Sequence, residues 1–328
     1  MQDIEKGNWT SIREFVLLGL GTFPELQPFL FCFFLVIYLM TITGNLLICL
    51  LVVADQHLHT PMYFFLGNLS CLDTCYSSIF LPRLLANLLT GQRTITVHGC
   101  LAQYHFFALC ATIETYLLAV MSYDRYLAIC SPLLYANIMN RKFCFQLMAV
   151  IWMNSSIFNI ILVVLMAQLS FCGPNVIDHY FCDLYPVEKL SCSDTSILEI
   201  ITFFMSFIFA IAPFLLTLIS YICIIGTIIK IKSTIGRQKA FSTCSSHLMV
   251  VCLYYGTLII VYVLPDSPTQ RPLNKIFSIF YTVMTPLVNP LIYTLRNKEV
   301  HKALRRFCSK VMIFGRSHLK VSISFQFY

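Results

Sequence analysis

The chain has 328 residues, of which 58% are hydrophobic and only 11% are charged, and its formal net charge is +7. Soluble domains carry about 25% charged residues, so this composition excludes an ordinary soluble protein. The length alone allows two domains, but the apolar residues form long blocks, which is typical of a chain that crosses a membrane several times.

Seven apolar blocks are each long enough to cross about 30 Å of hydrocarbon as a helix, which satisfies its own backbone groups. They cover residues 29–53, 61–89, 98–128, 143–167, 197–229, 240–264 and 273–295. Residues 1–24 contain charged side chains and no apolar core of a signal peptide, so we expect the first helix to direct its own insertion. The sequence therefore predicts an all-α membrane protein with a seven-transmembrane helix bundle.

Lysine and arginine are unevenly distributed between the segments that join these blocks. They concentrate in 141–142, 230–239 and 296–320, which share one side of the membrane. Because cytoplasmic loops carry the excess of basic residues, we expect a plasma-membrane protein with an extracellular N-terminus and a cytoplasmic C-terminus. The positive charge then describes a basic inner face that meets membrane lipid, and no nucleic-acid partner is expected.

This orientation divides the chain into four parts. They are an extracellular segment (1–24), the membrane domain (25–296), an amphipathic helix (297–310) and a tail (311–328). Asn8-Trp9-Thr10 is a glycosylation sequon in the first part, whereas the sequons at Asn68 and Asn154 fall inside predicted helices and are discounted. In 297–310, the residues Val300, Ala303, Leu304 and Phe307 recur at helical spacing between basic residues, which predicts a helix lying on the inner surface.

Four of the fifteen cysteines are expected on the outer face. Cys100 begins the third helix, and Cys172, Cys182 and Cys192 lie in the long second outer loop. An oxidising exterior favours disulfides, and four cysteines allow three pairings. The alternative is four free thiols.

Two acids are expected at similar depth in the membrane, Asp73 in the second helix and Glu114 in the third. Ionisable groups inside spans are candidates for function, and two carboxylates repel each other unless a proton or a cation lies between them. We expect a bound sodium ion or a shared proton here, in a polar cluster with Asn45, Ser70 and Asn289. The alternative is two carboxylic acids with separate hydrogen bonds. No other cofactor is expected.

Asp124 and Arg125 are expected at the inner end of the third helix. A charge pair at this edge forms a resting state that a helix movement can open; the alternative is a snorkelling anchor. Pro286 and Pro290 permit kinks in the seventh helix, and together with Asn289 they predict a hinge.

Four segments resemble the vertebrate odorant receptors, a branch of the rhodopsin-like G-protein-coupled receptors. They are "PMYFFLGNLSCLD" (61–73), "MSYDRYLAICSPLLY" (121–135), "KAFSTCSSHL" (239–248) and "PLVNPLIYTLRNKEV" (286–300). The second outer loop, "HYFCDLYPVEKLSCSD" (179–194), also looks like that of the family. The stretch 316–328 has no family counterpart that we recognise.

The resemblance implies the disulfides Cys100–Cys182 and Cys172–Cys192, and a sodium site at Asp73 and Glu114. It also implies an activation switch and a coupling site for a stimulatory olfactory-type G protein that raises cAMP. The residues assigned to this switch are Asp124, Arg125, Tyr126, Tyr221, Lys239, Asn289, Pro290 and Tyr293. In the active state, Tyr221 and Tyr293 are expected to join Arg125.

The predicted ligand pocket lies between the outer halves of the third, fifth, sixth and seventh helices, where the family binds odorants. Helical spacing selects Phe107, Ala108, Ala111, Thr112, Met205, Ser206, Phe209, Tyr255, Leu258, Ile259, Tyr262, Ser278 and Thr282. Tyr255 takes the place of the tryptophan toggle of other rhodopsin-like receptors. For any one of these residues, the alternative is ordinary helix packing.

This lining is apolar and aromatic with a few hydroxyl groups, so we expect a small, volatile, uncharged ligand. No enzymatic motif is evident, since no Ser-His-Asp order or metal-like histidine spacing occurs. Two alternatives to an odorant receptor are a non-olfactory chemosensory receptor, which the sequence does not distinguish, and a channel or transporter. Transporters tend to contain internal repeats, which this odd number of spans disfavours.

Overall fold

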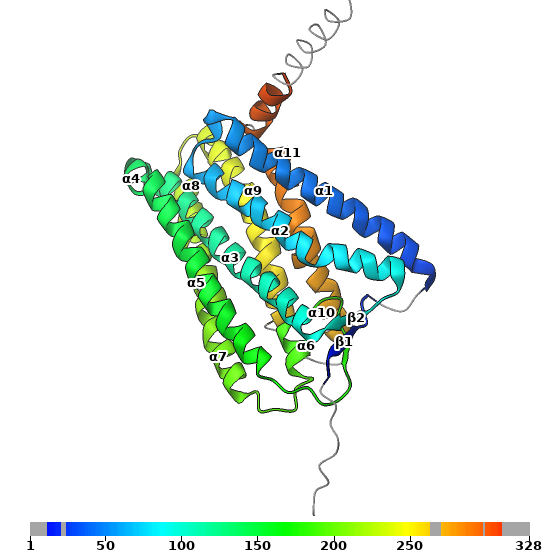
Figure 1. Cartoon of the computed structure of the whole chain (residues 1–328). Helices are drawn as coiled ribbons and strands as arrows, with labels where there is room; N and C mark the ends of the chain where they lie inside the picture. Colours follow the sequence, from blue (N-terminus) through cyan, green and yellow to red (C-terminus); the bar gives the residue numbers. More distant parts are fainter. Residues whose placement is uncertain (1–11, 21–23, 263–269, 298, 310–328) are drawn as a thin grey trace, which may run out of the picture.

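The computed structural model describes residues 12–20, 24–262, 270–297 and 299–309, and these form a bundle of long helices (Figure 1). The longest helices are α1 (Gln27–Ala54), α2 (Pro61–Thr90), α3 (Val97–Cys130), α5 (Arg141–Ala167), α8 (Ala212–Lys230) and α9 (Thr234–Tyr262). The shorter ones are α4 (Pro132–Ile138), α6 (Leu184–Glu188), α7 (Ser196–Ser206), α10 (Gln270–Ile279), α11 (Thr285–Arg296) and a last helix over 299–309. Single 3₁₀ turns precede and follow α1: η1 (Pro24–Leu26) and η2 (Gln56–Leu58).

Two of the predicted spans contain a π-helical turn. η3 (Phe207–Ile211) joins α7 to α8, and η4 (Phe280–Met284) joins α10 to α11. The next proline, Pro213 or Pro286, is the second residue of the helix that follows, where its missing N–H group is tolerated. Wide turns of this kind occur mostly at functional sites, and both lie among the residues predicted to bind ligand.

Helix α3 is the centre of the bundle. It packs against α2, α5, α8 and α9, whereas α1 packs mainly against α2 and α11. The most apolar stretch of α3 is 56% buried, but that of α1 is only 28% buried. Residues of α3 are therefore the ones placed to link several helices.

Length and hydropathy support a multi-pass membrane protein. In the described part of the chain, five helical segments are long and apolar enough to cross a membrane: Gln27–Ala54, Val97–Cys130, Arg141–Ala167, Ser196–Lys230 and Asn274–Thr294. The second predicted span, α2, is not among them, and the sixth contributes the shorter apolar helix His247–Val261. These two measures thus confirm five of the seven predicted spans.

Side chains at the helix ends explain several boundaries. Thr96 accepts a hydrogen bond from the Gly99 amide at 3.1 Å at the start of α3, and Asn140 accepts one from Phe143 at 3.0 Å at the start of α5. α2 ends at Gly91, whose φ of 71° is left-handed and suits glycine. The sixth helix begins at Thr234, earlier than the predicted residue 240, because a helix continues through polar residues once it leaves hydrocarbon.

A small sheet covers one end of the bundle, and none of its strands was predicted from the sequence. Strand β1 (Glu14–Leu17) lies between β2 (Thr94–Thr96) and β3 (Val176–Ile177). It pairs antiparallel with β2, with Phe15 opposite Ile95, and parallel with β3. Phe15 and Leu17 are buried. The sheet therefore holds the N-terminal segment and two loops together over the helices.

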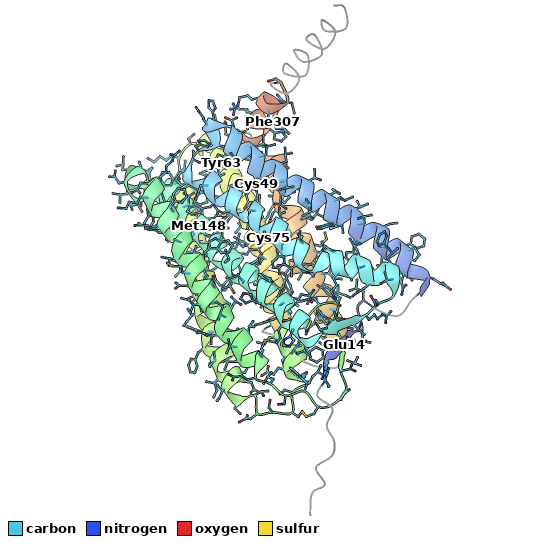
Figure 2. All side chains as sticks on the ribbon, viewed as in Figure 1. Glu14, Cys49, Tyr63, Cys75, Met148 and Phe307 are labelled. Carbon is cyan, nitrogen blue, oxygen red and sulfur yellow. A yellow bond between two sulfur atoms is a disulfide. The ribbon has the colours of Figure 1, made fainter. Side chains whose placement is uncertain are left out.

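We call the end with these three strands the sheet end, and the opposite end, with η2, α4 and the helix over 299–309, the far end. Figure 2 shows Glu14 at the first and Tyr63 and Phe307 at the second. In the last helix, Val300 and Ala303 are buried, and Leu304 and Phe307 pack partly against the core. The predicted amphipathic face thus lies against the bundle.

Candidate ligand-binding and signalling sites

Two disulfides fix the long loop at the sheet end, and they are the two pairs that the resemblance implies. Cys100 is bonded to Cys182, with their Cα atoms 5.5 Å apart, and Cys172 is bonded to Cys192 inside the loop. The Cys182 amide also donates to Oε1 of Gln103 at 3.0 Å. Both contacts attach this part of the loop to the first turns of α3.

Phe181, the residue before Cys182, covers the helices at the sheet end. The Phe181 side chain is fully buried, and its ring centroid lies 4.7 Å from that of Phe107 and 6.1 Å from that of Phe80. Phe107 in turn lies 5.5 Å from Tyr76 and 6.2 Å from Tyr281. The result is an aromatic cluster that joins the loop to α2, α3 and η4.

A hydrogen bond holds the same loop to the seventh span. The Tyr180 hydroxyl lies 2.8 Å from Oγ1 of Thr282, which also donates to the Ser278 carbonyl at 2.7 Å. Thr282 and Ser278 were both predicted to bind ligand, and both are buried. In this structure the Thr282 hydroxyl has loop and helix partners, so a ligand would have to compete for it.

His179 lies beside this contact. Its ring stacks on Tyr180 at 4.7 Å and meets Phe181 edge-on at 4.5 Å. Burial, together with the nearby Lys275, lowers the pKa of His179 to about 3, against an opposing effect of Asp178. Lys275 forms an ion pair with Asp178. The loop therefore holds a neutral histidine next to a surface charge pair.

The predicted residues of α3 divide between two packing clusters. Phe107 belongs to the aromatic cluster, whereas Ala108 packs against both that core and a second one around Phe158. The Thr112 hydroxyl donates to the Ala108 carbonyl at 2.7 Å and lies 3.4 Å from Nδ2 of Asn159 on α5. Thr112 thus contacts α5, while Phe107 faces α2 and η4.

The residues predicted on the fifth span lie toward α5. Phe209 stacks on Phe158 with centroids 4.3 Å apart and ring planes 10° apart, and Met205 packs in the same cluster. Ser206 is exposed. Met205 and Phe209 are therefore brought close to Ala108, but in these contacts they do not join the cluster around Phe107.

The sixth span meets α3 through two consecutive tyrosines. The Tyr255 hydroxyl donates to the Thr115 carbonyl at 3.1 Å, and the Tyr254 hydroxyl donates to the Ala111 carbonyl at 2.8 Å. Leu258 is partly buried and Ile259 is 40% exposed. The side chain of Tyr262 lies outside the described part of the structure. Of the predicted residues whose side chains are described on this span, Tyr255 is the one with a direct hydrogen bond to α3.

The acid pair lies in the middle of the bundle. Asp73 and Glu114 are fully buried. Nδ2 of Asn289 donates to Oδ2 of Asp73 at 2.9 Å. Oδ1 of Asp73 and both carboxylate oxygens of Glu114 have no hydrogen-bond partner among the described groups.

These free oxygens suit a hard cation, which prefers carboxylate and amide oxygens. The Oδ1 atoms of Asn45 and Asn289 are also buried without a partner in this region of the chain. The described residues contain no group of three or more acidic, histidine or cysteine side chains placed to hold a metal. A cation at this site would therefore rely on the two carboxylates and on neutral oxygens.

The kinked seventh span is attached to α1 by Asn45. Pro290 has no N–H group, so the carbonyl of Pro286, four residues earlier, loses its helical partner. Nδ2 of Asn45 donates to this carbonyl at 2.9 Å. A Cβ on Gly44 would lie 3.2 Å from the Pro290 ring. A small residue and an amide at consecutive positions of α1 thus accommodate the kink.

The Asp124–Arg125 pair is closed. Nε of Arg125 donates to Oδ2 of Asp124 at 3.0 Å, and Nη2 contacts the same oxygen. Tyr135 of α4 donates to Oδ1 of Asp124 at 2.8 Å. Tyr126, assigned to the switch by resemblance, stacks on Tyr123 at 6.2 Å. Asp124 is fully buried, and both of its carboxylate oxygens have hydrogen-bond partners inside the protein.

The two tyrosines expected to reach Arg125 have other surroundings in this structure. The Tyr221 hydroxyl lies 2.6 Å from Nδ1 of His247, and the Tyr293 hydroxyl is buried with no partner among the described groups. The side chain of Lys239 and the sequon at Asn8 lie outside the described residues. In this structure the Asp124–Arg125 pair is closed, and the described contacts of the two tyrosines do not include Arg125.

Several residues of these sites were not singled out from the sequence, notably Tyr135, Phe181, His247 and Tyr281. Tyr135 and His247 stand inside the motifs quoted above, so the motifs themselves were the available signal. Phe181 directly precedes a predicted disulfide cysteine, which places it over the bundle. Tyr281 lies in the π-helical turn η4. Such a turn changes which residues face the bundle, so a spacing of 3.6 residues per turn does not predict its position.

Comparisons with known proteins agree with this architecture. The family model described as "Olfactory receptor" matches residues 32–310. Olfactory receptor 1E16 of Mus musculus is 46% identical over 304 residues, covering 92% of this chain and 97% of its own. Olfactory receptor 1C1 of Homo sapiens is 46% identical over 311 residues, covering 95% and 99%.

The fold is similar to that of squid rhodopsin, with a TM-score of 0.69 and 14% identity over 89% of this chain and 87% of that one. This likeness concerns the fold, while the identity to the receptors above extends over nearly the whole chain. The chain therefore belongs to the olfactory receptor family, whose members are multi-pass membrane receptors that bind small molecules and couple to G proteins, and are not enzymes.

Proposed function

We propose that this odorant receptor binds small, volatile, uncharged molecules near the sheet end, between α3, η3, α9 and η4. The observation that carries the proposal is the enclosure of Phe107 by Phe181 and Tyr281. An apolar ligand gains free energy by burial there, at roughly 25 cal/mol per Å². Residues 104–112 contain no acid, so an amine ligand would lack a counter-charge, and the hydroxyl groups of Thr282 and Tyr255 are the available orienting groups.

Two neighbouring phenylalanines test this placement. Phe107 is buried in the aromatic cluster, whereas Phe106 is 55% exposed. In cells that report cAMP, a panel of volatiles would first identify agonists. Phe107→Ala should then raise the half-maximal agonist concentration about tenfold or more, a loss of about 1.4 kcal/mol of binding. Phe106→Ala should leave it nearly unchanged. Equal effects of the two variants, or no effect of either on any agonist, would contradict the proposed site.

The orientation in the membrane is part of the proposal: the sheet end outside and the far end in the cytoplasm. It is supported by the basic segments, which lie in loops and in the last helix at the far end, and by the disulfides at the sheet end. An epitope placed at the N-terminus should bind antibody on intact cells, and glycosidase treatment should change the mobility of the chain if Asn8 is glycosylated. A C-terminal epitope should require permeabilised cells.

We propose that ligand binding shifts a population between the closed Asp124–Arg125 pair and an open form. A ligand shifts such an equilibrium by its differential affinity, typically about 1–3 kcal/mol. In the open form, Arg125, Tyr221, Lys239 and Tyr293 would line a cavity for a helix of a stimulatory olfactory-type G protein, which raises cAMP. Asp124→Asn should raise basal cAMP, and Arg125→Ala should abolish the odour-evoked rise. Normal basal and evoked signalling in both variants would exclude this mechanism.

We propose that Asp73 and Glu114 hold a sodium ion in the resting form. The support is their shared burial and the unpartnered oxygens described above. Replacing sodium by choline should increase basal activity, and Glu114→Gln, which removes one charge from the pair, should abolish this sodium dependence. The same dependence on sodium in Glu114→Gln would contradict the site.

Two alternatives are distinguishable by experiment. An ion channel or transporter would lose its response when external ions are removed, whereas agonist-evoked cAMP should persist. A non-olfactory chemosensory receptor would show the same signalling, and the tissue in which the chain is expressed separates it from an odorant receptor.

A further inference from the structure

A cavity of about 430 Å³ lies at the far end, between the end of α1, the turn η2 and the helix over 299–309. None of the residues that line it belongs to the ligand pocket or to the switch. Its floor is apolar and includes Leu51, Ala303 and Phe307. Its rim is polar and includes Asp55 and Arg306. An apolar floor with a charged rim at the end of a membrane bundle matches an amphipathic ligand.

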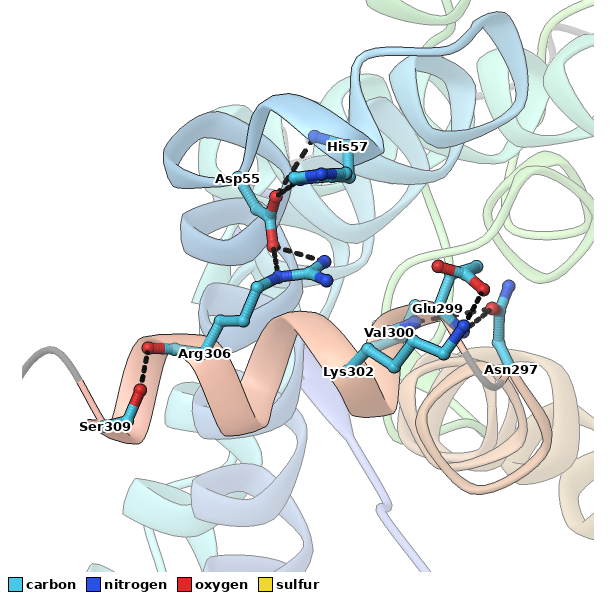
Figure 3. Close-up of polar contacts among 8 residues, drawn as sticks. All are labelled: Asp55, His57, Asn297, Glu299, Val300, Lys302, Arg306 and Ser309. Carbon is cyan, nitrogen blue, oxygen red and sulfur yellow. Dashed lines mark hydrogen bonds and ion pairs between the residues drawn. The ribbon is translucent and has the colours of Figure 1, made fainter.

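The rim is built around Asp55, as Figure 3 shows. Oδ1 of Asp55 accepts hydrogen bonds from the His57 amide at 3.0 Å and from its Nδ1 at 2.9 Å. Oδ2 accepts one from Nε of Arg306 at 2.7 Å, with Nη2 at the same distance. Burial acts to raise the pKa of Asp55, but the bonds from His57 and Arg306 outweigh it and lower the pKa to about 2. The carboxylate therefore stays charged and paired.

This arrangement turns donors, not the acid, toward the opening. The Asp55 side chain is only 12% exposed, whereas that of Arg306 is 38% exposed and that of His57 is 72% exposed. A guanidinium carries five N–H donors on three nitrogens. Asp55 accepts a hydrogen bond from Nε and forms an ion pair with Nη2, which is itself buried and has no hydrogen-bond partner among the described groups. The exposed part of the Arg306 guanidinium and the ring of His57 are placed to meet a phosphate.

The position of the last helix is fixed from its other end as well. The Tyr63 hydroxyl donates to Oδ1 of Asn297 at 3.0 Å, and the same oxygen accepts from the amides of Glu299 at 3.0 Å and Val300 at 3.4 Å. Asn297 thus caps the helix and ties it to α2. The cavity is held open between two anchored elements.

The apolar floor continues along the outside of α1. Leu46, Leu50 and Ala54 are spaced by four residues, so they share one face of the helix. All three are exposed, Leu46 at 52% and Leu50 at 47%, and Ala54 lines the cavity. An acyl chain can therefore run from the cavity along this face within the hydrocarbon layer.

The local charge favours an anionic headgroup. Arg306 is balanced by Asp55, and Lys302 by Glu299 at 2.7 Å. The exposed Arg305 on the same helix adds positive charge to this surface and forms no ion pair with an acid in the described part of the chain. Basic groups near the inner leaflet attract anionic lipid.

We propose that this cavity is a specific site for one anionic phospholipid of the inner leaflet, with its phosphate at Arg306 and His57 and an acyl chain against α1. The lipid would join the first inner loop to the last helix, next to the proposed G-protein cavity. The inference rests on the proposed orientation, which the epitope experiment tests separately.

The test measures lipid retained by the purified full-length receptor, independently of any odorant. The receptor is reconstituted in nanodiscs of phosphatidylcholine with isotope-labelled phosphatidylserine, extracted in detergent and analysed by native mass spectrometry. The wild type should retain labelled phosphatidylserine in preference to phosphatidylcholine. Equal retention of the two lipids would overturn the headgroup assignment.

Two matched pairs of variants locate the site. Ala54→Phe fills the cavity, whereas Val53→Phe adds the same bulk at a neighbouring residue that is 77% exposed and does not line it. Arg306→Ala and Arg305→Ala each remove one charge, but only Arg306 lines the cavity. Retention should fall about tenfold in Arg306→Ala, as expected for the loss of a charge-assisted bond, and about as much in Ala54→Phe, whose side chain occupies the space of the lipid. It should stay near the wild-type value in the two controls.

Ala54→Phe leaves the Asp55–Arg306 pair in place, so its result does not depend on whether Arg306→Ala loosens the helix. Equal retention by Ala54→Phe and Val53→Phe would overturn the site. Water-soluble phosphoserine should fail to displace the labelled lipid. Displacement by phosphoserine at concentrations similar to those of a short-chain phosphatidylserine would overturn the acyl half of the proposal.

Discussion

The Tyr221 hydroxyl lies 2.6 Å from Nδ1 of His247, and the two rings stack with centroids 5.9 Å apart. Both residues are buried, one on α8 and the other on α9. The bond keeps Tyr221 on a partner other than Arg125. Because the proposed active form needs Tyr221 beside Arg125, this bond stabilises the resting form.

Replacing His247 should therefore release Tyr221. His247→Phe keeps a buried ring but removes the hydrogen-bonding partner of Tyr221, and a bond of this kind contributes about 0.5–1.5 kcal/mol. We expect basal cAMP to rise about 2- to 10-fold, which is the population shift that this free energy allows. Basal cAMP per receptor at the cell surface is the measurement.

His105→Phe provides the matched control, since His105 is partly buried and its Nδ1 has no partner among the described groups. It should leave basal cAMP unchanged. Tyr221→Phe removes both the resting and the proposed active contact, and it should lower the evoked response. A His247→Phe receptor with wild-type basal output would show that the bond does not restrain the switch.

The hydrogen bond from Asn45 to the Pro286 carbonyl should contribute to the thermal stability of the receptor. In Asn45→Ala, the carbonyl of Pro286 loses the side-chain donor that it has among the described residues and stays buried next to a proline kink. Leaving a buried polar group unsatisfied costs about 1–3 kcal/mol. We expect a lower unfolding midpoint of the purified receptor in detergent, measured by thermal denaturation.

Asn68→Ala is the control for this change. Nδ2 of Asn68 donates to the Phe64 carbonyl at 2.8 Å, four residues earlier in the same helix, where the backbone bond remains. This variant should lose little stability. Similar losses in both variants would mean that Asn45 acts through packing alone and not through the Pro286 carbonyl.

The helices could be predicted from the sequence because each depends on a local property, a run of apolar residues with few charges. The start of α9 was misplaced since apolarity marks the membrane boundary and not the end of a helix. The sheet escaped prediction for another reason: β3 has two residues, and its partner β1 lies far away in the sequence. Such pairings depend on how the loops fold over the bundle.

The sites divide in the same way. The Asp124–Arg125 pair joins adjacent residues, so its closure followed from the sequence. Asn289 and Asp73 are 216 residues apart in the sequence. Their similar depth in the membrane predicted that both belong to one polar cluster, but it did not predict the hydrogen bond between them. His247 was not singled out, because nothing local in the sequence connects it to Tyr221, 26 residues earlier. Which side chains of different helices face each other is known only from the packing of the helices.

Tyr180 predicts how firmly the loop closes over the pocket. Tyr180→Phe removes the hydroxyl that lies 2.8 Å from Oγ1 of Thr282, while Thr282 keeps its bond to the Ser278 carbonyl. The loss should be at the low end of the range for a hydrogen bond, about 0.5 kcal/mol. We expect agonists to dissociate about twofold faster, measured by the decay of cAMP signalling after washout.

The control for this change is Tyr38→Phe. Its hydroxyl lies 3.2 Å from Oγ of Ser78, so the same kind of bond is lost between α1 and α2, away from the loop. Dissociation should be unaffected in this variant. Slower or unchanged dissociation in Tyr180→Phe would mean that the bond does not close the pocket.

His179 predicts how the sheet end responds to acid. Its pKa is lowered to about 3 by burial and by Lys275, whereas an unperturbed histidine titrates near 6.5. Between these values the unfolded loop binds a proton that the folded loop does not. The free energy of unfolding is therefore unaffected by His179 above pH of about 6.5 and decreases as the pH falls from there toward 3.

One such proton changes the free energy of unfolding by about 1.4 kcal/mol per pH unit within that window. The unfolding midpoint in detergent should fall between pH 7 and pH 5 in the wild type, and His179→Gln should reduce this fall because glutamine does not titrate. His98→Gln, at an exposed histidine of α3, should keep the wild-type dependence. Of the two histidines, His179 is the one enclosed by Tyr180 and Phe181. If His179→Gln and His98→Gln gave the same pH profile, the buried imidazole of His179 would not be the acid-sensitive group.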